Sequence, residues 1–413
     1  MSTLEEGILQ RRPESNNALP SPSLSKRIIF FVIHMVMMTL ILCVAGEIAL
    51  RVLPMGRFRS APFRQYDPVF GDSLVPNTRV VHRRGCFQGL VDINQWGFRD
   101  RERTLTKNPG EFRIALIGDS VVEAVQVKPE EVMNVQMEKL LQEKGYKNVE
   151  VLAFGIGGIG TTQEMMLYEQ KVRQFHPDLV LLLMSDNDIM NNSSTLQPES
   201  YGIHTWYAPY NDLGSDGQLV FRPVEKRRLN GPASFLERHS YLYYYLERVW
   251  SQFDIPLYKW HGMGVFYGSF SDDPLDPDWQ KAWSITTKVL QRFDQEVTRD
   301  GAHLVVFAWP IFSDIDSDWQ GRMLKQVRYI APQFNPDKFN VHLWQTAQQA
   351  GVTIDFLAPY FQQYRDAHHL QWPYFSFTCD THFNPLGHQV AAEAILQEVE
   401  QRGLLPLRAA TAN

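Results

Sequence analysis

Short apolar runs alternate with longer helical stretches from residue 111 onward, and this alternation constrains the fold more than any other feature. Each run is almost continuously apolar, which is typical of strands buried on both faces. The predicted strands are Phe112–Ile117, Val149–Phe154, Leu179–Met184, His303–Trp309 and Val352–Leu357. Helical patterns follow at Pro129–Lys144, Thr161–Phe175, 279–299, 339–350 and Leu386–Gln401. We therefore predict an α/β fold over residues 111–402, a three-layer α/β/α sandwich with a parallel sheet.

One stretch, residues 190–278, interrupts this alternation and is rich in aromatic side chains. We interpret it as an insertion that contains at least one helix, Ser234–Phe253. Its aromatic rings could stack on sugars or could form the core of a large insert, and the sequence leaves both alternatives open. Residues 51–110, before the sheet, are rich in Gly, Pro and Arg, so we expect an irregular lead-in there.

The amino-terminal segment has the length and composition of a membrane anchor. Residues 1–25 are polar and rich in Ser, Pro and Asn, which predicts a disordered cytoplasmic tail. An uncharged stretch follows from Ile28, and we place a transmembrane anchor at residues 28–50. A cleaved signal peptide is one alternative, although Val44 to Gly46 matches the small-x-small cleavage pattern only loosely. A lipoprotein signal is the other, but it needs a small residue before the cysteine, and Leu42 precedes Cys43. Basic residues flank the span on both sides, so the charges do not determine its orientation.

Charge and cysteine content exclude several classes of protein. The net charge is −6 and 21% of the residues are charged, so nothing indicates a nucleic-acid partner. The cysteines, Cys43, Cys86 and Cys379, form no CxxC pair, and His368-His369 lacks further ligands at metal-binding spacing. We therefore expect no metal and no cofactor. Cys86 and Cys379 could pair in an oxidising compartment or could be two free thiols.

The first predicted strand leads directly into Gly118-Asp119-Ser120. A serine at the carboxyl end of a buried strand, just before a helix, is well placed for nucleophilic attack, and its own backbone N–H can bind an oxyanion. A capping serine at a strand-to-helix turn is the structural alternative. The similar sequence Gly71 to Leu74 has no buried strand before it, so we reject Ser73 as a nucleophile.

The next two predicted strands end in polar or glycine-rich turns. The second strand runs into residues 154–161, where the N–H of Gly158 is a candidate oxyanion donor. The third ends in residues 185–188, where the side-chain amide of Asn187 could donate to the same charge. An ordinary polar turn explains Asn187 equally simply.

The carboxyl-terminal candidates lie just before the last predicted helix. His382 can serve as the general base for Ser120, and Asp380 can orient it. His388 could be the base instead, but it falls inside the helical run, where a packed histidine is expected. All the candidates follow a strand or precede a helix of one parallel sheet, so we expect them to gather at the same edge.

This arrangement resembles the SGNH (GDSL-type) hydrolase superfamily, whose four sequence blocks supply Ser, Gly, Asn and His. The stretch FGIGGIGTTQE looks like the family pattern NFGVSGYGTAQE, and HPDLVLLLMSDNDIMNN looks like KPDLVVLLFFLGNDVRDN. The resemblance implies Ser120 as nucleophile, His382 and Asp380 as the rest of the triad, and Ser120, Gly158 and Asn187 as the oxyanion hole.

Two features depart from the common pattern of the superfamily. Asp186 stands where the family usually has glycine, and a carboxylate there would oppose an oxyanion unless it points away. The Asp-x-His spacing of Asp380 and His382 resembles envelope- and polysaccharide-modifying members.

Residues 66–103 are similar to the lead-in of anchored bacterial members. That likeness implies a bacterial inner-membrane protein with its catalytic domain on the periplasmic side.

The sequence therefore predicts a serine esterase that acts on an acyl ester, with O-acetyl groups of a cell-envelope glycan as the expected substrate. A polysaccharide O-acetyltransferase would use the same triad. A catalytically inactive glycan-binding or assembly module is the alternative from a different class, and it is suggested by Asp186 and by the aromatic insertion.

Overall fold

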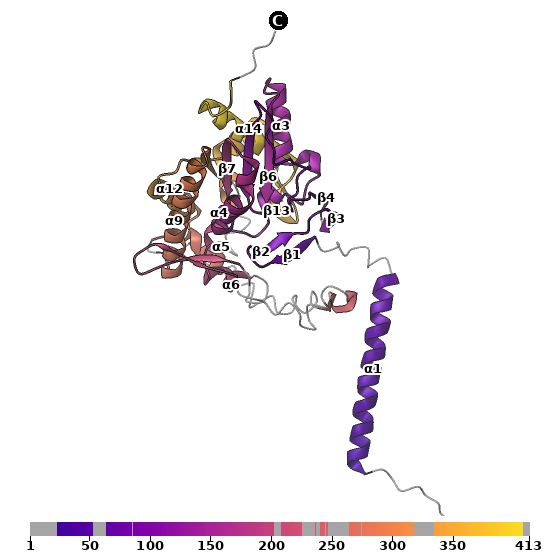
Figure 1. Ribbon diagram of the computed structural model, residues 1–413. Coiled ribbons are helices and arrows are strands. Elements are labelled where there is room, and N and C mark those ends of the chain that lie inside the picture. Colours follow the sequence, from indigo (N-terminus) through magenta and orange to yellow (C-terminus); the bar gives the residue numbers. More distant parts are fainter. Residues whose placement is uncertain are drawn as a thin grey trace, which may run out of the picture.

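The computed structural model describes residues 23–52, 63–84, 86–201, 208–224, 236, 240–243, 245–246, 264–273, 275–316, 318 and 334–407. Residues 1–22 of the predicted tail and most of the helix predicted at Ser234–Phe253 lie outside the described residues. The last two residues of the predicted tail, Leu24 and Ser25, begin the amino-terminal helix. The described part contains one central sheet with helices on both sides and a separate amino-terminal helix, as Figure 1 shows.

The central sheet has five parallel strands in the order β11-β10-β7-β5-β6. They are β5 (Phe112–Gly118), β6 (Val149–Gly155), β7 (Leu179–Met184), β10 (His303–Ala308) and β11 (Ile354–Phe356). The register places Gly118 opposite both Gly155 and Leu183, so the carboxyl ends of three neighbouring strands are level. The prediction of a parallel sheet is confirmed, and the three following turns begin at one edge.

Successive residues of each strand enter two different cores because side chains alternate across a sheet. Ala115 and Ile117 of β5 pack in the core beneath α4 (Thr161–Gln170), α9 (Pro277–Arg299) and α12 (Pro336–Ala350). Ile114 and Leu116 pack in the other core, beneath α3 (Met133–Glu143), α13 (Ala358–Ala367) and α14 (Pro385–Gln401). The three-layer α/β/α prediction is therefore confirmed.

Shorter elements surround these layers. The short helices are α2 (Ser120–Glu123), α5 (Asp188–Asn191), α6 (Leu196–Tyr201) and α10 (Phe312–Ile315), with single 3₁₀ turns η2 (Pro129–Glu131), η3 (Val172–Phe175) and η4 (Gly268–Phe270). Two further two-stranded sheets are β8 (Tyr210–Leu213) with β9 (Leu219–Arg222), and β12 (Ser376–Phe377) with β13 (Asp380–Phe383).

The lead-in contains two antiparallel hairpins where we expected irregular structure. The first pairs β1 (Arg64–Asp67) with β2 (Gly71–Leu74), and the second pairs β3 (Thr78–Arg84) with β4 (Phe87–Ile93). Ser73, the serine that we rejected, lies within β2 and is buried. The strands are short and polar on one side, because they bury only a small apolar cluster of Leu74, Val91 and Ile93.

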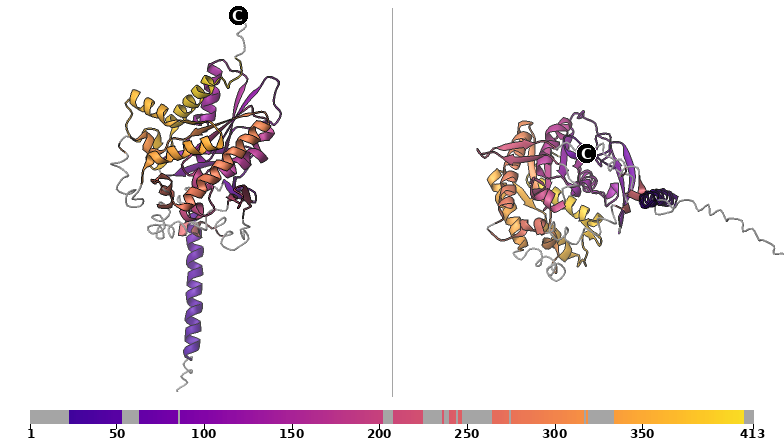
Figure 2. Two further views of the ribbon diagram at one scale, coloured as in Figure 1. Left: turned by 90° about the vertical axis from the view of Figure 1, so that its left-hand side faces the viewer. Right: turned by 90° about the horizontal axis from the view of Figure 1, so that it is seen from below.

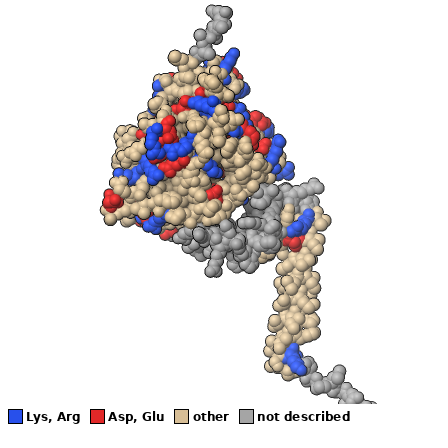
Figure 3. Space-filling view, viewed as in Figure 1, with Lys and Arg blue, Asp and Glu red and all other residues tan. Residues whose placement is uncertain are grey.

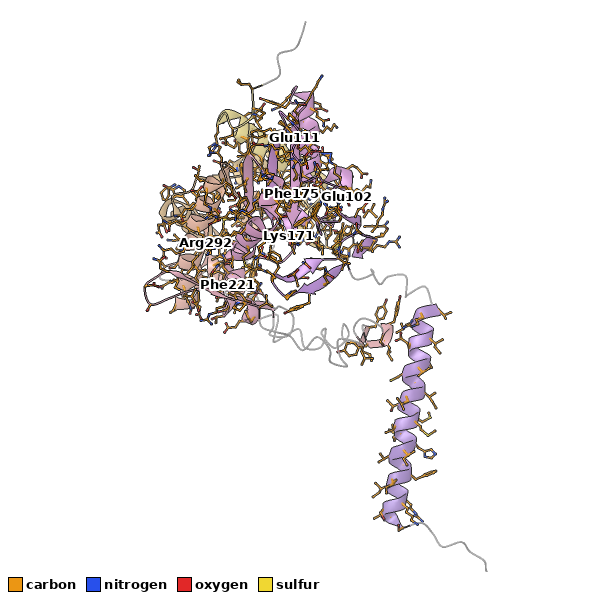
Figure 4. All side chains as sticks on the ribbon, viewed as in Figure 1. Glu102, Glu111, Lys171, Phe175, Phe221 and Arg292 are labelled. Carbon is orange, nitrogen blue, oxygen red and sulfur yellow. A yellow bond between two sulfur atoms is a disulfide. The ribbon has the colours of Figure 1, made fainter. Side chains whose placement is uncertain are left out.

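The amino-terminal helix α1 (Leu24–Val52) has 29 residues with a mean hydropathy of 2.8 over its most apolar window, and none of that window is buried. Figure 2 shows α1, in indigo, projecting from the body that holds the sheet. In Figure 3 charged side chains lie at the two ends of the helix and are missing between them, and Figure 4 shows its side chains projecting on all sides. A helix of this length and composition is consistent with a membrane anchor or with a signal sequence.

A disulfide joins Cys86 to Cys379, which are 293 residues apart in the sequence. The sequence left this pairing open. The bond connects the hairpin of β3 and β4 to the turn directly before β13, so it links the lead-in to the strand that carries Asp380 and His382. Cys43 is free and exposed in α1.

Candidate active site

Ser120 is the first residue of the short helix α2, and only Asp119 separates it from the end of the buried strand β5. Asp119 caps this helix, because its carboxylate accepts the backbone N–H of Val121 at 3.0 Å. The helix ends after one turn at Ala124, which adopts a left-handed conformation with φ +51°. A short, capped turn of this kind presents the Ser120 hydroxyl at the carboxyl edge of the sheet.

His382 lies within hydrogen-bond distance of Ser120 although 262 residues separate them in the sequence. Its Nε2 is 2.8 Å from the Ser120 Oγ. On the other side of the ring, Nδ1 contacts the carboxylate of Asp380, which also accepts the backbone N–H of His382 at 3.0 Å. Asp380 and His382 lie two residues apart on β13, and the period of two in a strand puts both side chains on one face. This geometry explains the Asp-x-His spacing.

The Asp380 carboxylate also sets the basicity of the imidazole. Burial by itself would lower the pKa of His382, but the hydrogen bond and the charge of Asp380 outweigh burial and raise that pKa. A more basic imidazole is a better proton acceptor. Its proton has to be lost before it can serve as a base, so the raised pKa also defines an acidic limit.

Gly158 and Asn187, the other two candidate oxyanion donors, line the same cavity as Ser120. Gly158 has φ +80°, a conformation that glycine adopts without strain, and its carbonyl accepts the Asn191 amide at 3.3 Å. Among the described residues, the backbone N–H groups of Ser120 and Gly158 donate to no protein acceptor. The Asn187 amide donates to Asp119 at 2.9 Å. A primary amide has two N–H groups, so a second donor remains on Asn187.

The carboxylate of Asp119 accepts several hydrogen bonds at the site, a role that the sequence did not reveal. It is 1% exposed and accepts hydrogen bonds from Val121, Ser185 and Asn187, so it ties the turn after β5 to the turn after β7. Burial raises the pKa of Asp119, and hydrogen bonds from Val121 and Asn187 lower it in part. Asp119 is part of the Gly118-Asp119-Ser120 sequence, but the sequence does not show that its carboxylate reaches the turn after β7.

Two further carboxyl groups, Glu164 and Asp188, interact electrostatically with Asp119, and the sequence did not identify them as part of the site. Both are fully buried, and both Glu164 oxygens lack a hydrogen-bond partner among the described residues. Burial and the repulsion of neighbouring carboxylates raise the pKa of each well above its ordinary value.

The candidate alternative base, His388, is buried in α14, where burial and the positive charge of Arg99 lower its pKa to about 3.

The cavity above Ser120 measures about 380 Å³. Its aromatic lining includes Tyr267, Phe270, Trp309, Phe312, Phe334 and Tyr374. Asp186 and Asp316 also line it, and no Lys or Arg is among the described residues of the lining. In the part of the chain that the structure describes, no group of three or more His, Cys, Asp or Glu side chains could hold a metal ion.

Asp186 faces this cavity, and burial together with the charge of Asp119 raises its pKa to about 6. Its carboxyl group is therefore neutral well below pH 6 and ionised above it, where the charge opposes an oxyanion. We expect Asp186→Asn to raise kcat/KM on a neutral ester above pH 6 by about five-fold, which corresponds to about 1 kcal/mol, and to change little at pH 5. Paired pH–rate profiles measure this effect. An equal loss at all pH values would instead mean that the carboxylate assists the reaction.

The disulfide leads to a second expectation. Cys86→Ser should lower the free energy of unfolding by about 2–5 kcal/mol, because the lead-in hairpin would no longer be tied to the turn before Asp380. Denaturant unfolding of the full chain measures the change. Cys43→Ser is the matched control, since Cys43 is exposed in α1 and unpaired, and it should change nothing. Equal stability of the two variants would contradict the expected contribution of the bond.

Comparisons with known proteins found similar solved structures but no family model and no curated relative. Among solved structures, the chain is similar to a lipase/acylhydrolase from Enterococcus faecalis, with 13% identity, a TM-score of 0.36, and coverage of 70% of this chain and 96% of that one. An acetyl xylan esterase is similar at 14% identity and a TM-score of 0.37, with coverage of 70% and 100%.

A third similar structure is a catalytic mutant of an acetylxylan esterase from Geobacillus stearothermophilus, at 15% identity and a TM-score of 0.38, with coverage of 71% and 96%. Identities and TM-scores this low carry no argument about substrate or mechanism. The chain itself has a three-layer α/β/α fold with a five-stranded parallel sheet.

Proposed function

We propose that this protein is a serine esterase of SGNH type, with Ser120 as nucleophile, His382 as general base and Asp380 as the residue that orients the base. The observation that carries the proposal is the 2.8 Å contact between Ser120 Oγ and His382 Nε2 at an open cavity. A nucleophile in contact with a base, whose other nitrogen meets a carboxylate, is the arrangement that activates a hydroxyl group.

In the proposed reaction, Ser120 Oγ attacks the carbonyl carbon while His382 Nε2 takes the hydroxyl proton. The oxyanion that forms accepts hydrogen bonds from the N–H groups of Ser120 and Gly158 and from the free N–H of Asn187. The ester C–O bond then breaks, and His382 gives its proton to the departing alcohol. Water attacks the acyl-enzyme with His382 again as base, which releases the carboxylic acid and restores Ser120.

The lining of the cavity supports a neutral ester as substrate. Carboxyl groups of Asp186 and Asp316 would repel an anionic acyl group, and the described lining offers no cation to hold one. Aromatic rings such as Tyr267 and Trp309 suit the apolar faces of a sugar. An O-acetyl group on a neutral glycan of the cell envelope satisfies both conditions, so we propose this class of substrate.

The same proposal places the catalytic domain outside the cytoplasm. Disulfides persist in oxidising compartments and are rare in the cytosol, so the Cys86–Cys379 bond supports an extracytoplasmic site. The helix α1 supplies the membrane anchor within residues 28–50, and residues 1–25 form the cytoplasmic tail. We infer a single-pass protein of a bacterial inner membrane, with residues 111–402 on the periplasmic side.

The proposal is tested by acetate release from an acetylated neutral polysaccharide by the full-length protein in detergent. We expect release of free acetate and faster turnover of acetyl than of long-chain chromogenic esters. Acetate that reaches an added sugar hydroxyl instead of water would identify a transferase with the same triad. A folded protein that releases no acyl group from any of these esters would contradict the proposal and would favour an inactive glycan-binding module.

A further inference from the structure

Arg64, in the first lead-in strand β1, contacts both the nucleophile helix and the glycine-rich loop. Its Nη1 donates to the Glu123 carboxylate on α2 at 3.0 Å, and its Nη2 donates to the carbonyl of Gly157 at 2.5 Å. Its Nε donates to Asp72 on β2 at 2.8 Å. Three partners from three segments therefore fix the plane of one guanidinium group.

The contact with Gly157 fixes the direction of the next N–H group. A trans peptide is planar, and its C=O and N–H point in opposite directions. The carbonyl of Gly157 and the N–H of Gly158 belong to the same peptide unit. Because Arg64 holds the carbonyl on one side, the Gly158 N–H is directed to the other side, where Gly158 borders the cavity beside Ser120.

The loop around Gly157 is closely packed, so the peptide between Gly157 and Gly158 has little room to take another orientation. A side chain at Gly157 would meet Glu123 Oε2 at 2.8 Å, Arg64 Nη1 at 3.2 Å and Ser120 Cβ at 3.3 Å. The Gly157 N–H donates to the same Glu123 carboxylate. Glu123 therefore receives both Arg64 and the loop, and it lies three residues after Ser120 in α2.

We infer that Arg64 is a positioning residue, which aims the Gly158 N–H at the oxyanion by holding the Gly157 carbonyl. This inference rests on the proposed function, because it assigns a role in the oxyanion hole of that same site. It also gives a purpose to the hairpin of β1 and β2. The Asp72 of the rejected Gly71–Leu74 sequence orients Arg64 and takes no part in the chemistry.

The charge of Arg64 suits this role. Burial acts to lower the pKa of Arg64, but the carboxylates of Glu123 and Asp72 outweigh burial and raise it, so the side chain stays protonated. A lysine would keep the charge but has a single nitrogen, which cannot reach three partners in one plane. The guanidinium shape, as well as its charge, is therefore required.

The test compares Arg64→Gln and Arg64→Lys with the wild-type full-length protein on a soluble acetyl ester. Losing the aim of one oxyanion donor should lower kcat by on the order of 10²-fold in both variants, with KM changed by less than about three-fold. Arg79→Gln is the matched control, because Arg79 forms an exposed ion pair with Asp92 in the neighbouring hairpin, and it should keep wild-type kcat.

A second readout separates aim from general loss of structure. Sulfur accepts hydrogen bonds less well than oxygen, so the wild type should prefer an ester over its thionoester, in which sulfur replaces the carbonyl oxygen. That preference should fall in the Arg64 variants, whereas partial unfolding would lower both rates equally. If Arg64→Gln does not fold, the ratio of ester to thionoester turnover in Arg64→Lys tests the role of Arg64.

The outcomes distinguish this inference from the proposed function. An inactive, folded wild type would overturn the proposed function. An active wild type with unchanged kcat in both Arg64 variants, or with reduced kcat but an unchanged oxygen-to-sulfur preference, would overturn the role of Arg64 and leave the esterase intact.

Discussion

Ser120→Ala should lower kcat for ester hydrolysis by about 10⁴–10⁶-fold without unfolding the protein. Only the hydroxyl group is removed, and the proposed acyl-enzyme cannot form without it. Ser120 is partly exposed at the cavity, and its side chain is not part of a hydrophobic core. The thermal midpoint should therefore stay close to that of the wild type. Steady-state kinetics on a chromogenic acetyl ester and a thermal unfolding scan measure both quantities.

Ser73→Ala is the matched control for this experiment. Ser73 belongs to the Gly71–Leu74 sequence that carries the family's name, but it lies buried in β2 and its hydroxyl has no hydrogen-bond partner among the described residues. Removing an unpaired buried hydroxyl is neutral or slightly stabilising, so this variant should keep full activity. Full turnover in Ser120→Ala, or its loss in Ser73→Ala, would contradict the assignment.

Asp380→Asn should lower kcat by about 10³–10⁴-fold, because an amide at this position favours the wrong tautomer of His382 and no longer stabilises its protonated form. The size of the effect is measured on the same soluble ester, with the thermal midpoint as a check of folding. Asp366→Asn is a suitable control, since Asp366 is exposed in α13 and its carboxylate pairs with the neighbouring Arg365.

The same substitution should change the pH dependence in a defined direction. Asp380 raises the pKa of His382 against the opposing effect of burial, so its replacement by Asn should lower that pKa. The base would then lose its proton at lower pH, and the acidic limb of the kcat/KM profile should move to lower pH. A limb that stays in place while activity falls would mean that another group controls it.

The alternation of apolar runs predicted the sheet because buried parallel strands show this pattern without tertiary information. The strands β5, β6 and β7 came within a residue or so of the predicted ranges. The hairpins of the lead-in could not be predicted in the same way. They are short, bury only a small apolar cluster and depend on pairing between neighbouring segments, so neither strong periodicity nor a long apolar run marks them.

The candidate site was predictable to the extent that its residues follow strands of one sheet. The edge of the sheet brings the turns after β5, β6 and β7 together, and β13 brings Asp380 and His382 to them. What the sequence could not give are contacts that depend on side-chain reach. The bonds from Asn187 to Asp119 and from Arg64 to Gly157 span 68 and 93 residues, and nothing in the local pattern indicates either.

The pairing of Cys86 with Cys379 illustrates the same limit. The two cysteines are 293 residues apart, and the number of cysteines alone does not show which of them approach each other. Only the packing of the β3–β4 hairpin against the turn before β13 brings them together.

Labelling of the folded full-length protein with a fluorophosphonate, followed by peptide mapping, tests the central assignment most directly. The phosphonyl group should attach stoichiometrically to Ser120, and His382→Ala should slow labelling strongly, because an unactivated serine reacts poorly with this reagent. A folded wild type that remains unlabelled, or that carries the label on another serine, would contradict the account.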